Sequence, residues 1–251
     1  MSQMKEKLKR IGAWIWDIVK NSLPALVMYV MAGTILMMLT MKADESIDKE
    51  EALRITWDNK KLLWTLVCCI GAAAYNGLLT WACGGNQYEM LVSGNLKRVS
   101  ASYGEGFKIS SHKEAKEYRA WKGFAIGAVI SLLTLIVGIL FGCNQAAINS
   151  LKPSKGVGAI MLVGFFLSGW SVLPLYYLNM SGIAVNYFLS CLFALLPIIV
   201  SGVFYIAGAY ARRAKSIRQQ ELADKAAAAD AAKVKKINYG GLPGTKPKKR
   251  K

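Results

Sequence analysis

Charged residues are absent from four long windows of this chain. Residues 23–41, 62–83, 123–142 and 157–210 contain no Lys, Arg, Asp, Glu or His, although the chain carries 32 basic and 15 acidic residues. A helix needs about 20 apolar residues to cross a hydrocarbon core of about 30 Å, and a charge at its centre costs at least about 2.5 kcal/mol. The first three windows each fit one crossing, and the last can hold two. The pattern predicts an all-α, polytopic membrane protein.

Five hydrophobic helices follow from these windows, because the last window divides at residues 178–183. The expected spans lie near residues 23–41, 62–83, 123–142, 157–178 and 183–210. This membrane domain, residues 23–210, contains a cytoplasmic loop over 84–122. A basic amphipathic helix over 1–22 precedes it, and a basic tail over 211–251, helical and then disordered, follows it. The apolar runs do not alternate with period two, which excludes a transmembrane β-barrel.

The first 22 residues predict an amphipathic helix at the membrane surface. Apolar residues recur there at steps of three and four, and lysines occupy the opposite side. Such a helix lies along the headgroup region with its apolar face buried. The apolar residues are Leu8, Ile11, Ile15, Ile18 and Val19, and the lysines are Lys5, Lys9 and Lys20.

Charge also sets the expected orientation. Lys and Arg near span ends favour the cytoplasm, so residues 1–22, the 84–122 loop and the 211–251 tail are expected there, while the acidic 42–61 loop faces out. Five full crossings contradict this orientation, since they place the two termini on opposite sides of the membrane. One solution is that the last window makes a single net crossing, because part of it forms a re-entrant or broken helix. The other solutions are that the N-terminus is outside or that the tail is exported. We favour the first, which violates no charge preference. Residues that could break a helix there are Gly169, Pro174 and Gly182.

The third window carries a stripe of small residues at helical spacing. Steps of three and four keep all six on one face, where a neighbouring backbone can approach closely. The stripe predicts a helix-packing seam, either within one chain or between subunits, although chance alignment of membrane glycines is an alternative. Its residues are Gly123, Gly127, Ser131, Thr134, Gly138 and Gly142.

Polar side chains gather in the middle of the last window, around residues 168–187. A broken helix at membrane depth can line a ligand site, as in many transporters. A simpler alternative is a tight turn between two spans over residues 177–183. The candidate substrate-binding residues are Tyr176, Asn179, Ser181 and Asn186.

Catalytic chemistry has little support. His112 is the only histidine, and no nucleophile–base pair or metal-ligand spacing accompanies it. The five cysteines are interpreted as packing residues, since free Cys behaves as a small buried hydrophobe. We therefore expect no catalytic, cofactor-binding or metal-binding residues. Ser111 and Glu114 have the spacing of a capping box, which predicts a helix from Ser111 through Trp121 into the third span.

The tail is a candidate polyanion-binding segment, with thirteen basic and three acidic residues over 211–251. Basic clusters next to a span bind anionic lipid headgroups, and flexible basic ends bind nucleic acid, including ribosomal RNA. A topology signal without a ligand is the alternative. The candidate residues are Arg212, Arg213, Lys215 and Arg218 beside the span, and Lys246, Lys248, Lys249, Arg250 and Lys251 at the end.

The leading functional hypothesis is a non-catalytic integral protein of the plasma membrane with its tail in the cytoplasm. The short loops and the basic tail resemble those of bacterial membrane proteins. It would be a subunit or assembly factor of a membrane complex, with partners that include the lipid bilayer and other membrane subunits or a second copy. The alternative is a transport component with a small-molecule site at residues 168–187. A membrane-embedded enzyme is the weakest interpretation.

Overall fold

The computed structural model of the chain describes residues 2–40, 59–101, 111–150 and 154–238, and every regular element in these ranges is a helix. Five helical stretches are long and apolar enough to cross a membrane, which confirms the prediction of a helical fold with five hydrophobic helices. The elements are α1 Ser2–Thr40, α2 Asn59–Ala101, α3 Ser111–Glu114, α4 Trp121–Cys143, α5 Gln145–Ile148, α6 Lys155–Met180, the 3-10 helix η1 Tyr187–Leu189, α7 Ser190–Phe193 and α8 Leu195–Asn238.

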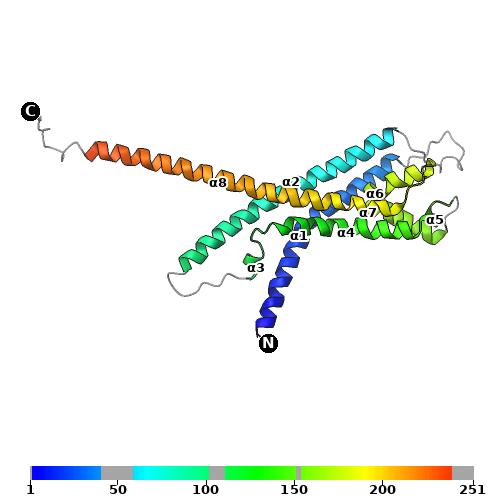
Figure 1. Cartoon of the computed structure of the whole chain (residues 1–251), viewed down its shortest axis with the longest axis horizontal. Coiled ribbons are helices and arrows are strands. Elements are labelled where there is room, and N and C mark those ends of the chain that lie inside the picture. The colour runs from blue at the N-terminus through cyan, green and yellow to red at the C-terminus, as the bar shows by residue number, and fades with distance from the viewer. Residues whose placement is uncertain (1, 41–58, 102–110, 151–153, 239–251) are drawn as a thin grey trace, which may run out of the picture. The chain divides into compact units, whose positions relative to one another are not determined.

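The chain divides into two compact units, Met1–Ala209 and Tyr210–Lys251. The first is a helical bundle, and Figure 1 shows α3 at one end of it and α5 with α7 at the other. The second unit continues α8 as far as Asn238, and its side chains from Arg213 to Ala231 are all exposed. The disorder predicted for the end of the tail falls on residues outside the described ranges.

Helix α8 packs against both α4 and α2 in the bundle. It runs antiparallel to α4, because Gly127 approaches Ile198 while Gly123 approaches Tyr205. It runs parallel to α2 and crosses it so closely that a Cβ on Gly208 would overlap the carbonyl oxygen of Trp81. Glycine at this crossing allows the two backbones to touch, as in small-residue seams of membrane helices.

Helix α6 is broken at Ser168, whose φ of −142° and ψ of 32° are not helical. The two halves fold back on each other, since the rings of Phe165 and Tyr176 have centroids 5.1 Å apart. In a straight helix these residues would be about 16 Å apart along the axis at about 1.5 Å per residue. Both halves reach the same end of the bundle, where Gly164 approaches Phe141 and Tyr177 bonds to Thr40.

The vertex of α6 lies deep in the bundle and its polar groups are partnered. The Ser168 hydroxyl donates to Thr134 Oγ1 at 3.1 Å, and Gly169 lies against Gly33 of α1. Pro174 lacks the N–H that would bond to the Trp170 carbonyl in the second half of the helix. The Cys69 thiol approaches that carbonyl instead, at 3.7 Å.

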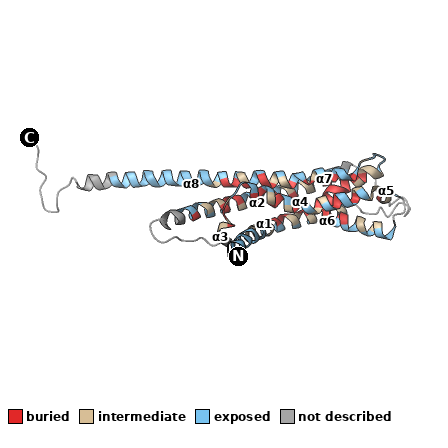
Figure 2. Cartoon of the chain, turned by 60° about the horizontal axis from the view of Figure 1, so that its bottom comes forward, coloured by how far each residue is buried: buried red, intermediate tan, exposed pale blue. Residues whose placement is uncertain are grey.

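Aromatic side chains form much of the buried interior, which Figure 2 shows in red where α2, α4, α6 and α7 meet. Phe141 is fully buried and contacts both Phe165 and Tyr187, with ring centroids 5.5 and 5.6 Å away. Trp170, which is 2% exposed, contacts Tyr29 of α1 at 5.0 Å. The core therefore joins α1 and α4 to the broken helix.

Two boundaries differ from the sequence-based expectation. Helix α2 continues to Ala101, so residues 84–101 of the predicted loop are helical. The helix predicted to run from Ser111 through Trp121 is interrupted, since α3 ends at Glu114 and α4 begins at Trp121. The interruption has a physical cause, because the carbonyl groups of Ala115 and Glu117 accept hydrogen bonds from the Lys122 side chain.

Candidate functional site

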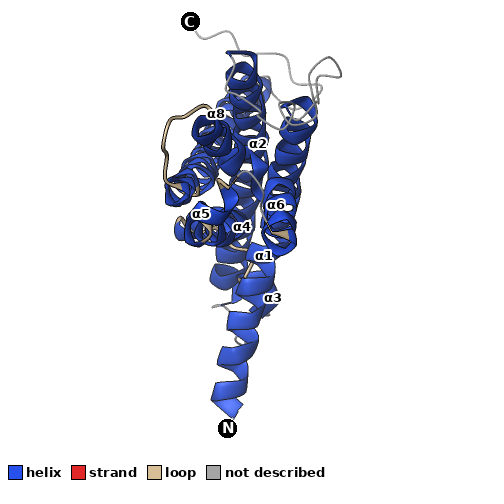
Figure 3. Cartoon of the chain, turned by 90° about the vertical axis from the view of Figure 1, so that its right-hand side faces the viewer, coloured by secondary structure: helices blue, strands red, loops and turns tan. Residues whose placement is uncertain are grey.

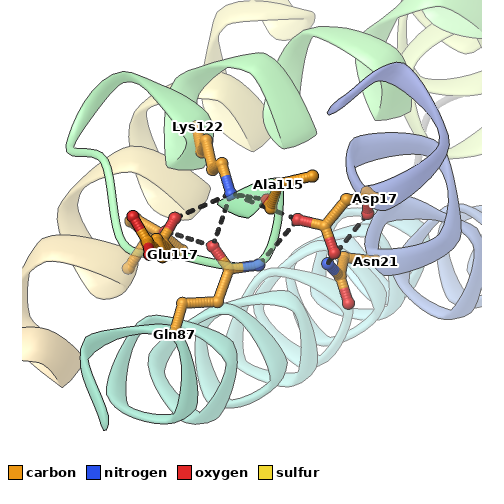
Figure 4. Close-up of polar contacts among 7 residues, drawn as sticks. Asp17, Asn21, Gln87, Ala115, Glu117 and Lys122 are labelled. Carbon is orange, nitrogen blue, oxygen red and sulfur yellow. Dashed lines mark hydrogen bonds and ion pairs between the residues drawn. The ribbon is translucent and has the colours of Figure 1, made fainter. Parts of the chain in front are cut away.

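A buried lysine lies at the α3 end of the bundle. Lys122, in the first turn of α4, has a side chain only 1% exposed. Its Nζ lies 3.3 Å from Asp17 Oδ2 and 3.2 Å from Gln87 Oε1. The same Nζ donates to the carbonyl oxygens of Glu117, at 2.8 Å, and Ala115. Figure 4 shows these acceptors converging on the ammonium group.

The surrounding groups bond to one another as well. Gln87 Nε2 donates to Asp17 Oδ2 at 2.9 Å, and the Tyr205 hydroxyl donates to Gln87 Oε1 at 2.6 Å. Asn21 Nδ2 donates to the Asp17 carbonyl at 2.8 Å. The Lys122 network, defined as Asp17, Gln87, Lys122 and Tyr205 with the two carbonyl groups, therefore joins α1, α2, α4, α8 and the segment after α3.

The network explains how a charge can be buried at the start of α4. A cation near a helix N-terminus is disfavoured by the helix dipole, and a buried charge needs a partner and hydrogen bonds. Lys122 obtains an ion pair with Asp17, whose side chain is 11% exposed, and three further acceptors. The backbone N–H of Tyr118 also donates to the Gln87 carbonyl, at 3.0 Å, which fixes the segment between α3 and α4.

The hydrogen bonds of the network hold and orient the segments that it joins, and the Cys83 thiol lies close enough to Asp17 and Lys122 to interact with their charges. Within the described ranges, no group of three His, Cys, Asp or Glu side chains is placed to bind a metal ion. The five thiols are all free, and four of them are partly buried in the bundle. We therefore interpret the network as a positioning device for α1 and the α3–α4 segment.

Sequence reasoning did not identify the Lys122 network. The four side chains of the network are far apart in the chain, and none of them belongs to a recognisable local motif. They are Asp17, Gln87, Lys122 and Tyr205. The available signal was a lysine at the very edge of a charge-free window, with an aspartate and a glutamine just beyond two other windows. A polar group so close to a span must find a partner, but the partner depends on helix packing.

The stripe of small residues on α4 is covered within one chain. A Cβ on Gly127 would lie 2.5 Å from the Ile198 Cα, and the Ser131 hydroxyl donates to the Ala194 carbonyl at 2.5 Å. Along the same face, Gly123 meets Tyr205, Thr134 meets Ser168, Gly138 meets Ser190 and Gly142 meets Phe188. The seam thus holds α8, η1, α7 and the vertex of α6.

The candidate substrate residues serve the backbone around them. Asn179 accepts from the Val185 N–H at 2.9 Å and donates to the Val185 carbonyl at 2.8 Å. Ser181 donates to the Tyr177 carbonyl at 2.8 Å, and Asn186 caps η1 by accepting from the Phe188 N–H at 2.9 Å. Together they brace the turn at Gly182, which has a φ of 86°. Tyr176 contacts Phe165.

A further buried polar pair joins α2 to α8. Asn76 Nδ2 donates to the Ser201 hydroxyl at 3.0 Å, and that hydroxyl lies 3.1 Å from Asn76 Oδ1. Both residues are fully buried in the middle of predicted spans. Hydrogen bonds of this kind hold membrane helices together, so this pair is a packing contact between α2 and α8. The pattern of charged residues does not predict it, because both side chains are neutral.

The candidate polyanion-binding residues lie in the second unit or outside the described ranges. Arg213, Lys215 and Arg218 are exposed and Arg212 is partly buried. The five terminal candidates from Lys246 to Lys251 fall in the part of the chain that the structure does not describe. No protein family, curated protein or solved structure matches this chain.

Proposed function

We propose that this chain is a non-catalytic subunit or assembly factor of a membrane complex, and that its basic tail contacts a cytoplasmic polyanion. The main observation is the contrast between the two units. In the bundle, polar side chains bond to each other, whereas the tail helix is exposed from Arg213 to Ala231 and buries almost nothing. An exposed helix that is followed in the sequence by a cluster of lysines suits an intermolecular role better than a role in folding.

The topology that we propose makes α6 a re-entrant helix. Its two halves would enter and leave from the same side, with the vertex at Ser168 between α1 and α4. The chain would then cross four times, through α1, α2, α4 and the stretch from η1 to α8. Both termini and the 84–122 segment would lie in the cytoplasm, in agreement with the positive-inside rule.

Cysteine accessibility tests this topology. Single cysteines at Ser2, Ser46, Ser154 and Thr245 would be labelled in intact cells with a membrane-impermeant maleimide, against the unmodified chain as background. In intact cells we expect labelling at positions 46 and 154 and not at positions 2 and 245. After lysis we expect labelling at all four positions. Labelling at Thr245→Cys but not at Ser2→Cys in intact cells would instead mean that the last window crosses twice.

The tail helix does not have the pattern of a helix that lies flat on a bilayer. Ile217 and Leu222 are its large apolar side chains between residues 211 and 231, and five residues of α-helix separate their directions by about 140°. A surface helix would align them in one stripe. This favours a tail helix surrounded by solvent over one that lies on the bilayer.

Binding of a polyanion can be measured with the whole protein in neutral-lipid nanodiscs. We would replace the basic residues from Lys246 to Lys251 with Gln, and use a variant with residues 237–245 replaced by a Gly-Ser sequence as the length-matched control. Ribosome co-sedimentation should weaken more than tenfold in the first variant and remain in the control, and wild-type binding should fall steeply with salt. Nanodiscs with anionic lipid provide the second arm. Unchanged binding to both partners by the Gln variant would remove the polyanion role.

A transport component is the second candidate, because one observation favours it specifically. The break in α6 places the Ser168, Ser171 and Thr134 hydroxyls in mid-bundle, and discontinuous helices at membrane depth accompany substrate sites in many transporters. Uptake by a strain that depends on the protein should be lost in the Asn179→Ala/Asn186→Ala variant and in Ser168→Ala. Normal uptake by both variants at normal expression would exclude this candidate.

A further inference from the structure

The N-terminal half of α1 contacts the rest of the bundle along one side only. Helix α1 has 39 residues, so at about 1.5 Å per residue it is about 58 Å long, nearly twice the thickness of a hydrocarbon core of about 30 Å. Only its second half is free of charged residues. Figures 1 and 3 show its first half running across the long axis of the bundle, below the other helices in both views. If the spans follow that axis, this half lies along the membrane plane.

One face of this segment is apolar and exposed. Met4, Leu8, Ile11 and Ile15 follow each other at steps of four, three and four, and they are 72%, 63%, 53% and 57% exposed. These steps align the four side chains along one side of a helix. Trp16, which is 62% exposed, points about 110° away from the centre of this stripe. Large apolar side chains arranged in a continuous stripe mark a surface that another phase or molecule covers.

Contacts on another face set the rotation of the segment about its own axis. Arg10 Nε lies 3.3 Å from Glu114 Oε2, and the Trp14 ring lies 5.7 Å from the Trp121 ring. One turn further on, Asp17 pairs with Lys122. Residues 10, 14 and 17 point about 120° away from the apolar stripe at 100° per residue. The Lys122 network and its neighbours therefore hold the stripe away from the protein.

We propose that this stripe is buried in the interface of an anionic membrane leaflet, with Lys5, Lys7 and Lys9 contacting lipid phosphates. Residues 1–22 carry five basic and two acidic side chains, and one of the acids, Asp17, is already paired. An interfacial helix with cations beside an apolar stripe has the charge that an anionic headgroup layer attracts. The exposed Trp16 is the residue type enriched at headgroup depth.

The position of the segment favours lipid over a second protein. The segment comes immediately before the charge-free part of α1 in the chain. It therefore lies at the level at which the span meets the headgroups. Its direction across the bundle axis keeps the segment near that level (Figure 1). A narrow stripe with Lys5 and Lys7 on its two flanks also resembles an interfacial helix more than a protein contact, which depletes lysine at its core.

Photo-crosslinking of the full-length protein in nanodiscs tests the proposal. A benzoylphenylalanine in place of Leu8 is compared with the same group in place of Glu6, which is exposed on the opposite face. We expect lipid adducts at least fivefold more frequent at position 8 than at position 6. Equal adduct yields at the two positions, or protein adducts in place of lipid at position 8, would overturn it.

Lipid selectivity provides the second measurement. In native mass spectrometry, the Lys5→Gln/Lys7→Gln/Lys9→Gln variant should retain at most half as many phosphatidylglycerol molecules as the wild type. The matched control is Lys225→Gln/Lys233→Gln/Lys235→Gln in the tail, which should retain the wild-type number if the tail does not bind lipid. Because the tail charges are intact in the first variant, loss of lipid there separates this proposal from the polyanion role. Retention of the wild-type number by the first variant would contradict the contribution of these lysines.

The rotation of α1 can be altered separately. The Trp14→Ala/Glu114→Ala variant removes two contacts that fix the segment and leaves the stripe itself unchanged. The ratio of lipid adducts at positions 8 and 6 should fall by at least half in this variant. An unchanged ratio would show that the protein contacts do not orient the stripe.

Discussion

The two ends of the helical bundle are held together by different chemistry. At the α3 end, the buried Lys122 ion pair and its amide and carbonyl acceptors join four long helices. At the other end, the hydrogen bonds join neutral groups, as between Thr40 and Tyr177, the aromatic contacts gather around Phe141, and the charge in contact is the Lys61 ammonium, 5.2 Å from the centre of the Tyr177 ring. A charged network is strong only when complete, whereas a neutral contact can be lost at modest cost. The α3 end should therefore be the more sensitive to single substitutions.

Breaking the Lys122 pair should give the largest loss of stability. Lys122→Met leaves Asp17 without its cation, and removal of one partner from a buried pair costs about 3–5 kcal/mol. The free energy of unfolding would be measured in detergent by titration with a denaturing surfactant. The Lys122→Met/Asp17→Leu double variant should recover a large part of the loss, since it buries no unpaired charge. Equal losses in the single and double variants would show that the pair is not the stabilising unit.

Overfilling the α2–α8 crossing should have the next largest effect, because it separates two backbones that touch close to the Lys122 network. Gly208→Leu would force its side chain into the Trp81 carbonyl, and overpacking costs about 1–3 kcal/mol. Gly71→Leu is the matched control, since a Cβ on Gly71 meets nothing within 4 Å. The fraction of folded monomer in size-exclusion chromatography should fall for the first variant and not for the second.

At the neutral end, single changes should cost less. Tyr177→Phe removes the partner of the Thr40 hydroxyl, and a neutral hydrogen bond contributes about 1 kcal/mol. Thr40→Val should cost a similar amount, and the double variant should cost less than the sum of the two. Additive losses in this double-mutant cycle would mean that the hydroxyl groups do not stabilise the end together.

The smallest predicted effect concerns the thiol beside Pro174. Cys69→Ala leaves the Trp170 carbonyl without the donor that approaches it at 3.7 Å, and interhelical hydrogen bonds in membranes average about 0.6 kcal/mol. Cys69→Ser retains a donor and should be close to wild type in thermal stability. In a Pro174→Ala background, which restores a backbone N–H, the Cys69→Ala change should become silent. A loss of the same size in both backgrounds would mean that Cys69 acts by packing alone.

The two ends also differ in how far the sequence revealed them. The turn at the neutral end was visible beforehand, because Asn179, Ser181 and Gly182 are close together in the chain and bond locally. The network at the α3 end was not visible, because its members come from helices separated by many residues. Local hydrogen bonds follow from local sequence, but long-range pairs depend on which helix faces meet.

The sequence by itself determined the helical class, the five apolar helices and the stripe of small residues on α4. Each follows from the cost of placing charge in hydrocarbon or from the period of a helix, and both are local properties. Only the tertiary structure decided that the stripe is covered by the same chain, that α6 folds back at Ser168 and that Lys122 finds Asp17. These outcomes depend on which surfaces fit together in three dimensions, since a buried group must be satisfied by whichever neighbour packing brings within reach.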